Sequence, residues 1–127
     1  MARRLILVAT ILCLTTIAGG LAGADDEAED LFHRGVRLEE SGDLDGAVEA
    51  LSRAAELSPD NAAIYNDRGV VFSRLKQYDR AIEDFDRALA LNPASPGVLA
   101  NRGKACREKG DSQQAARDYD KALAIDP

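Results

Sequence analysis

The sequence predicts an all-α solenoid built from three copies of one helix-turn-helix unit. Small residues and prolines return after a shift of 34 residues, with no insertion between copies. Self-similarity at a fixed period of this size is typical of stacked repeats, in which each unit packs mainly on its neighbours. The repeated columns are Gly35/Gly69/Gly103, Ala47/Ala81/Ala115, Ala54/Ala88/Ala122 and Pro59/Pro93/Pro127.

Larger apolar residues recur at helical spacing between these columns, and they locate the helices. Small residues such as Gly103 and Ala115 allow two helix backbones to approach closely. Turns are expected at Gly42-Asp43, Lys76-Gln77 and Gly110-Asp111, and Ser95-Pro96 is a typical helix start. The large columns are Leu31/Tyr65/Leu99, Leu38/Phe72/Cys106 and Leu51/Phe85/Tyr119. The predicted helices are 28–41, 44–57, 62–75, 78–91, 96–109 and 112–125.

The columns resemble the tetratricopeptide (TPR) repeat, whose pattern is W-x2-L-G-x2-Y, then A-x3-F, then P. The middle unit matches it with Tyr65, Gly69, Phe72, Ala81, Phe85 and Pro93. The resemblance covers residues 28–127 and implies a right-handed superhelical solenoid of three TPR-like repeats. The repeat boundaries are then 28–61, 62–95 and 96–127.

One column departs from the family pattern. The leucine before the conserved glycine is replaced by Arg34, Arg68 and Arg102. We expect each arginine stem to lie along the helix interface with its guanidinium reaching outward to a carboxylate. Asp84 or Glu83 is the expected partner of Arg68. Such pairs are expected to be partly exposed, and to contribute only about 0–1 kcal/mol each.

Residues 1–24 have the features of an export signal. Arg3 and Arg4 precede the apolar stretch 5–17, and Ala22-Gly23-Ala24 supplies the small residues of a signal-peptidase site. Cleavage there leaves a chain that begins at Asp25, with an acidic segment at 25–27. The alternative is an uncleaved membrane anchor, because residues 5–24 contain no charge.

Composition narrows the partners of the exported chain. The net charge of −6 becomes −8 when the two arginines of the signal are removed. An acidic protein is poorly suited to bind nucleic acid or anionic lipid. Cys106 is then the only cysteine, so no internal disulfide is expected. No Asn-x-Ser/Thr site is present, which favours a periplasmic or otherwise secreted bacterial protein over a eukaryotic secretory one.

No pattern indicates catalysis, a cofactor or a metal. His33 is the only histidine, and no nucleophile lies in predictable reach of it. Cys106 occupies an apolar column and is expected to be buried. The acidic run 25–30 lacks the spacing and the glycine of a calcium loop, and no zinc spacing or phosphate loop occurs. We therefore expect a protein that is not an enzyme.

Binding is the function that the resemblance implies. TPR proteins hold extended peptides or partner helices in a concave groove lined by the first helix of each repeat. By this resemblance the groove is expected to contain an apolar track between acids toward the N-terminal end and bases toward the C-terminal end. The alternative is that this surface is merely solvated. The expected partner-binding residues are Phe32, Val36, Glu39, Asn66, Val70, Arg74, Asn101, Lys104 and Arg107.

One family function is excluded by the residues present. Chaperone-binding TPR domains hold a C-terminal carboxylate with a clamp of Lys, Asn, Asn, Lys and Arg. An aspartate and apolar residues at such positions would repel or ignore a carboxylate. The matching positions here are Phe32, Val36, Asp67, Gly97 and Asn101.

Two functions follow. The first is a scaffold or interaction module that binds a peptide or a partner helix, and the second is an assembly subunit that self-associates through its terminal repeats. The last unit is more polar than the others, as terminal repeats often are, but Leu123 and Ile125 remain apolar. Burying each again would contribute about 1.5–3 kcal/mol, which is marginal against the cost of association. We expect a monomer at micromolar concentration and a weak homodimer through Leu123 and Ile125 when concentrated.

Overall fold

The computed structural model describes residues 23–127, and the predicted signal segment up to residue 22 lies outside the described residues. A first helix covers residues 23–41 of this part of the chain. It is followed by α2 (Leu44–Leu57), α3 (Ala62–Arg74), α4 (Tyr78–Leu91), α5 (Pro96–Lys109) and α6 (Ser112–Ile125). Within residues 23–127 no strand occurs, so the predicted all-α class is confirmed.

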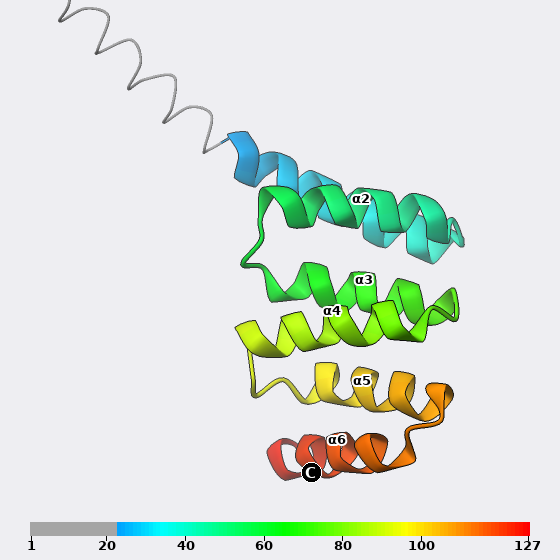
Figure 1. Cartoon of the computed structure of the whole chain (residues 1–127). Coiled ribbons are helices and arrows are strands. Elements are labelled where there is room, and N and C mark those ends of the chain that lie inside the picture. Colours follow the sequence, from blue (N-terminus) through cyan, green and yellow to red (C-terminus); the bar gives the residue numbers. More distant parts are fainter. Residues whose placement is uncertain (1–22) are drawn as a thin grey trace, which may run out of the picture.

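The helices stack as antiparallel pairs in chain order (Figure 1). Each helix from α2 onward packs on the next one along the chain. In addition, α3 contacts α5, whereas among the described helices α4 contacts neither α2 nor α6. The first helices of the repeats therefore lie closer together than the second helices, and the face that α3 and α5 share is the inner, concave face of the stack.

Local sequence explains where the helices begin and turn. The Ser95 hydroxyl accepts a hydrogen bond from the Val98 backbone N–H, with Pro96 at the first helical position, as predicted. Gly42 and Gly110 end their helices with φ of +88° and +102°. Lys76 occupies the same column with φ of +60°, a left-handed conformation that costs a residue with a side chain more than it costs glycine.

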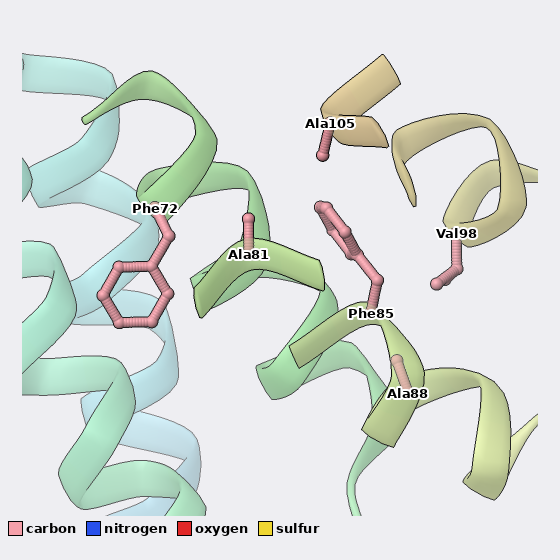
Figure 2. Packing of buried hydrophobic residues seen from close by; sticks show 6 residues of the cluster. All are labelled: Phe72, Ala81, Phe85, Ala88, Val98 and Ala105. Atoms are coloured by element: carbon pink, nitrogen blue, oxygen red, sulfur yellow. The ribbon is translucent and has the colours of Figure 1, made fainter. Parts of the chain in front are cut away.

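The repeated glycines permit close contact between the two helices of each repeat. A Cβ added at Gly69 would lie 2.6 Å from Cε1 of Phe85, and one added at Gly103 would lie 3.3 Å from the Ala115 carbonyl oxygen. Figure 2 shows the Phe85 ring extending from α4 toward Ala105 of α5. Val48 of α2 packs against the cluster that contains Phe72, Phe85 and Ala105, so this core joins the first repeat to the second and third.

The structure refines two predicted helix boundaries. The first helix already includes residues 23–27, although we expected it to begin at 28, so the acidic segment 25–27 is helical and exposed. The predicted cleavage point between Ala24 and Asp25 lies within this helix. The third helix ends at Arg74, one residue earlier than predicted, because Leu75 begins the turn.

Two of the three column arginines pair with an aspartate of the second helix in their own repeat. The Arg68 guanidinium donates to Asp84 through Nε at 2.8 Å and Nη2 at 2.7 Å. Arg102 donates to Asp118 in the same bidentate geometry, at 2.9 and 2.7 Å. The predicted pairing of Arg68 is therefore confirmed, with Asp84 as its partner.

The prediction was wrong in two respects. Arg34 has no acidic partner among residues 23–127, because Ala50 stands where Asp84 and Asp118 stand in the later repeats. The pairs are also more buried than expected, since Asp118 is fully buried and Asp84 nearly so. The hydrogen bonds to these carboxylates hold the pKa of both arginines above its ordinary value.

Candidate binding groove on the concave face

The inner face presents two junctions, one between the first and second repeats and one between the second and third. At the first junction Arg74 of α3 crosses to the first helix. Its Nη1 donates to the Glu39 carbonyl oxygen at 2.9 Å and to Glu39 Oε1 at 3.1 Å. Val71 fills the space beneath and is fully buried. The first junction is therefore closed by one ion pair and one branched side chain.

The second junction has the same backbone but different side chains. Shifting by one repeat replaces Val71 with Ala105, Arg74 with Glu108 and Glu39 with Ser73. A serine side chain is too short to form the bridge, and alanine leaves space that valine occupies. The second junction is open as a result, and it contains a cavity of about 220 Å³ between α3, α4 and α5.

The cavity has an apolar floor and a polar rim. Phe85, Tyr78 and Ala105 supply apolar surface together with Val70. The Ser73 hydroxyl at its wall is buried and has no hydrogen-bond partner among residues 23–127. An unsatisfied buried hydroxyl is unusual in folded proteins. The full set of lining residues is Val70, Ser73, Arg74, Tyr78, Phe85, Asn101, Lys104, Ala105 and Glu108.

Four of the predicted groove residues meet at this cavity: Val70, Arg74, Asn101 and Lys104. Asn66 lies beside it, because Asn101 Nδ2 donates to Asn66 Oδ1 at 3.1 Å. Lys104 is exposed and forms no ion pair within residues 23–127, so its ammonium group is available.

The other predicted groove residues lie elsewhere. Glu39 belongs to the closed first junction. Phe32 is half-buried, packs against the core and lines a separate cavity near the start of the first helix. Val36 is also half-buried and lines none of the described cavities, and Arg107 is exposed beside Glu108. Phe32 and Val70 therefore line two separate cavities.

Tyr78, Phe85 and Ala105 are cavity residues that the sequence analysis did not assign to the groove. Phe85 belongs to one of the apolar columns that locate the helices, and Tyr78 belongs to a second helix, while the resemblance restricts the groove to first helices. The signal that could have revealed them is the change from Val71 in the second repeat to the smaller Ala105 in the third.

Electrostatics near the junctions are mixed. Burial raises the pKa of Asp67, and nearby Glu39 adds to the rise, while a hydrogen bond from Asn66 opposes it. Burial likewise raises the pKa of the Cys106 thiol, and this residue is buried as predicted.

Within residues 23–127 no group of three or more His, Cys, Asp or Glu side chains could hold a metal ion. None of the helices described in that range could cross a membrane.

These observations define a class of protein: an α-solenoid of paired helices with an indented inner face. A family model described as tetratricopeptide repeat matches residues 32–96 and 72–127, which together span most of the sequence. The chain belongs to the tetratricopeptide repeat family. No curated protein sequence matches it.

Solved structures show the same fold. The first TPR of Spaghetti (RPAP3) bound to the HSP90 peptide SRMEEVD is 25% identical, with a TM-score of 0.79 over 81% of this chain and 82% of that chain. The Arabidopsis OM64 TPR domain is 23% identical, with a TM-score of 0.80 over 82% and 86%. MamA is 26% identical, with a TM-score of 0.76 over 80% of this chain and 59% of MamA.

Proposed function

We propose that this chain is a non-catalytic protein–protein interaction module whose ligand is a peptide or a partner helix. The observation that carries the proposal is the difference between the two junctions. The first is closed by the Arg74–Glu39 pair and by Val71, whereas the second is open in the same fold. A local opening with an apolar floor and convergent polar groups is the usual form of a binding pocket.

The open junction suits one apolar side chain of the ligand. Val70, Tyr78 and Phe85 would contact that side chain, while Ser73 and Asn101 offer hydrogen bonds to the ligand backbone. Lys104 would favour an acidic residue next to that apolar residue in the ligand. The family relationship supports this proposal, since the RPAP3 domain is described in complex with a peptide.

The experiment uses a library of random phage-displayed peptides, selected on the purified protein. Selected peptides should share one large apolar residue, and they should shift the amide NMR signals of Val70, Tyr78 and Ala105. Ala105→Val restores the side chain found at the closed junction and should weaken binding at least about tenfold by filling the pocket. Ala90→Val adds the same two methyl groups at an exposed position of α4 that does not line the cavity, so it is the matched control and should leave affinity unchanged.

Two outcomes would show that this cavity is not the peptide-binding site. One is a selected peptide that binds Ala105→Val as tightly as the parent protein, and the other is an absence of any selected peptide. The peptide SRMEEVD serves as a specificity probe. It should not bind, because Asp67 stands where the carboxylate clamp requires an asparagine.

We also propose that the protein is exported and cleaved after Ala24. Support comes from the basic start, the apolar stretch and the Ala22-Gly23-Ala24 site. Protein recovered from the cell envelope should have the intact mass of a chain that begins at Asp25. A mass that includes Met1, in the membrane fraction, would favour the uncleaved anchor instead.

Self-association is the second candidate function, and the outward face of α6 favours it. Leu123 and Ile125 are 59% and 45% exposed, and they are the large hydrophobic residues exposed among those described. We propose that any homodimer through them is weak. Analytical ultracentrifugation should show a monomer at micromolar concentration. A tight dimer that Leu123→Glu dissociates would instead identify an assembly subunit.

A further inference from the structure

The outward face of α6 repeats a surface that is already covered once within this chain. Position by position, Asp120 and Leu123 of α6 correspond to Asp86 and Leu89 of α4. In α4 this surface lies under α5. In α6 the same columns are open, because Leu123 is 59% exposed while Leu89 is half-buried against the core.

The internal copy shows what chemistry covers such a surface. Arg102 of α5 holds Asp118 of its own repeat, and its Nη1 also reaches back to Asp86 of α4 at 2.8 Å. The preceding junction uses the same geometry, since Arg68 Nη1 donates to the Ser52 hydroxyl of α2 at 3.2 Å. At both junctions an arginine of the covering helix therefore donates a hydrogen bond to the side chain in the Ser52/Asp86/Asp120 column.

Apolar or small residues flank that arginine. Val98 and Ala105, four residues before and three residues after Arg102, pack into the core cluster that includes Phe85. Figure 2 shows both of them on the side of α5 that faces Phe85. Arg102 therefore lies between two apolar contacts on its helix, and its guanidinium is largely buried while the Asp86 carboxylate remains partly exposed.

We propose that the surface formed by Ala116, Tyr119, Asp120 and Leu123 is a second docking site, which binds a helix of a partner protein. On the partner helix, this surface would recognise an arginine with an apolar residue four positions before it and a small residue three positions after it. Asp120 is exposed and has no ion-pair partner within residues 23–127, so its carboxylate is available to that arginine. This surface is separate from the groove, which is lined by α3, α4 and α5.

A second copy of this chain is a poorer occupant. Its first helix carries Arg34 at the arginine position, but Asp30 and Arg37 stand where α5 has Val98 and Ala105. If the first helix of a second copy docked on α6 as α5 docks on α4, its Asp30 carboxylate would lie over Leu123. Pairing α6 with α6 around Asp120 would bring two carboxylates together. Both arrangements lose free energy that an apolar flank would supply.

The experiment uses a synthetic peptide with the sequence of residues 94–110, which carries the covering helix, and the full chain labelled with 15N. The peptide should shift the amide signals of Tyr119, Asp120 and Leu123. Asp120→Asn should weaken its binding about tenfold, as expected for the loss of a charge-assisted bond. Glu83→Gln removes an exposed carboxylate from α4 and should leave the affinity unchanged.

A second peptide, in which glutamine replaces the residue that corresponds to Arg102, completes a double-mutant cycle. It should bind the parent protein about tenfold more weakly, and it should bind Asp120→Asn with no further loss. The proposal is wrong if the peptide causes no shifts, if its shifts map to the groove, or if Asp120→Asn binds it as tightly as the parent. A homodimer that depends on Asp120 would contradict it as well, by identifying a second copy as the occupant.

Discussion

Nη2 of Arg102 lies 2.7 Å from Oδ1 of Asp118, whose side chain is fully buried. Gln114 donates a further hydrogen bond to the same oxygen at 2.9 Å. The family pattern places a leucine at the arginine position. In this protein a buried carboxylate and a guanidinium replace the corresponding apolar contact, in two of three repeats. A buried carboxylate is tolerated only while its hydrogen bonds are made.

Removing the arginines should therefore have graded effects on stability. Arg102→Met leaves Asp118 buried and unpaired, which is expected to cost about 3–5 kcal/mol. Arg68→Met should cost slightly less, because Asp84 is a little more exposed. Arg34→Met is the matched control and should change stability by less than about 0.5 kcal/mol. Urea denaturation followed by circular dichroism measures all three, and equal losses would contradict the ranking.

The glycine columns should differ in their tolerance of alanine. A Cβ at Gly69 would lie 2.6 Å from Phe85, whereas at Gly103 the nearest atom is Cε1 of Tyr119 at 3.1 Å. Overpacking typically costs about 1–3 kcal/mol, and alanine regains about 1 kcal/mol of helix propensity. Gly69→Ala should be destabilising and Gly103→Ala close to neutral. Thermal unfolding of both variants tests the order, and a larger loss at Gly103 would refute it.

Lys76 is a site where glycine should stabilise the fold. Its φ of +60° is the only positive value among the non-glycine residues described, and the other two repeats have Gly42 and Gly110 in this column. Relief of the left-handed strain is worth about 1–2 kcal/mol, but glycine loses about 0.5–1 kcal/mol through backbone entropy. Lys76→Gly should raise the free energy of unfolding by up to about 1.5 kcal/mol. Lys76→Ala is the control and should give no gain, since it keeps a Cβ.

The closing bridge of the first junction should be transferable to the second. Ser73→Glu alone places a carboxylate near Glu108 and should destabilise slightly. Adding Glu108→Arg recreates the Glu39–Arg74 pair, with an expected coupling of about 0.5–1 kcal/mol for an exposed bridge. The double variant should also lose peptide binding in the groove. A double-mutant cycle by chemical denaturation would contradict this if the coupling were zero.

Asp67 should make stability depend on pH in the opposite sense to most aspartates. Its pKa is raised in the folded state, chiefly by burial. The folded protein therefore retains this proton in a window just above the ordinary aspartate pKa, and stability falls as pH rises through that window. Asp67→Asn should stabilise the protein at pH 7, and the gain should shrink as the pH falls toward 4. A gain that stays constant across this range would show that titration is not its cause.

The period, the helices and most of their ends follow from the local sequence. These features depend on local chemistry, such as the Ser95 cap, the Gly110 turn and the apolar columns that recur with the period. The pairing of Arg68 with Asp84 was also predictable, because a guanidinium buried at a helix interface requires an acid on the facing helix. The missing partner of Arg34 is visible in the sequence as Ala50, which occupies the column of Asp84 and Asp118.

Which part of the inner face is open depends on tertiary packing. The two junctions have the same backbone, and they differ by the two methyl groups that Val71 has and Ala105 lacks and by one ion pair. That pair joins Arg74 to Glu39, which are separated by 35 residues. Whether two long side chains so far apart in the sequence meet depends on how closely their helices pack, to within about one ångström. Periodicity places residues on a face, but the packed core determines which of them surround a cavity.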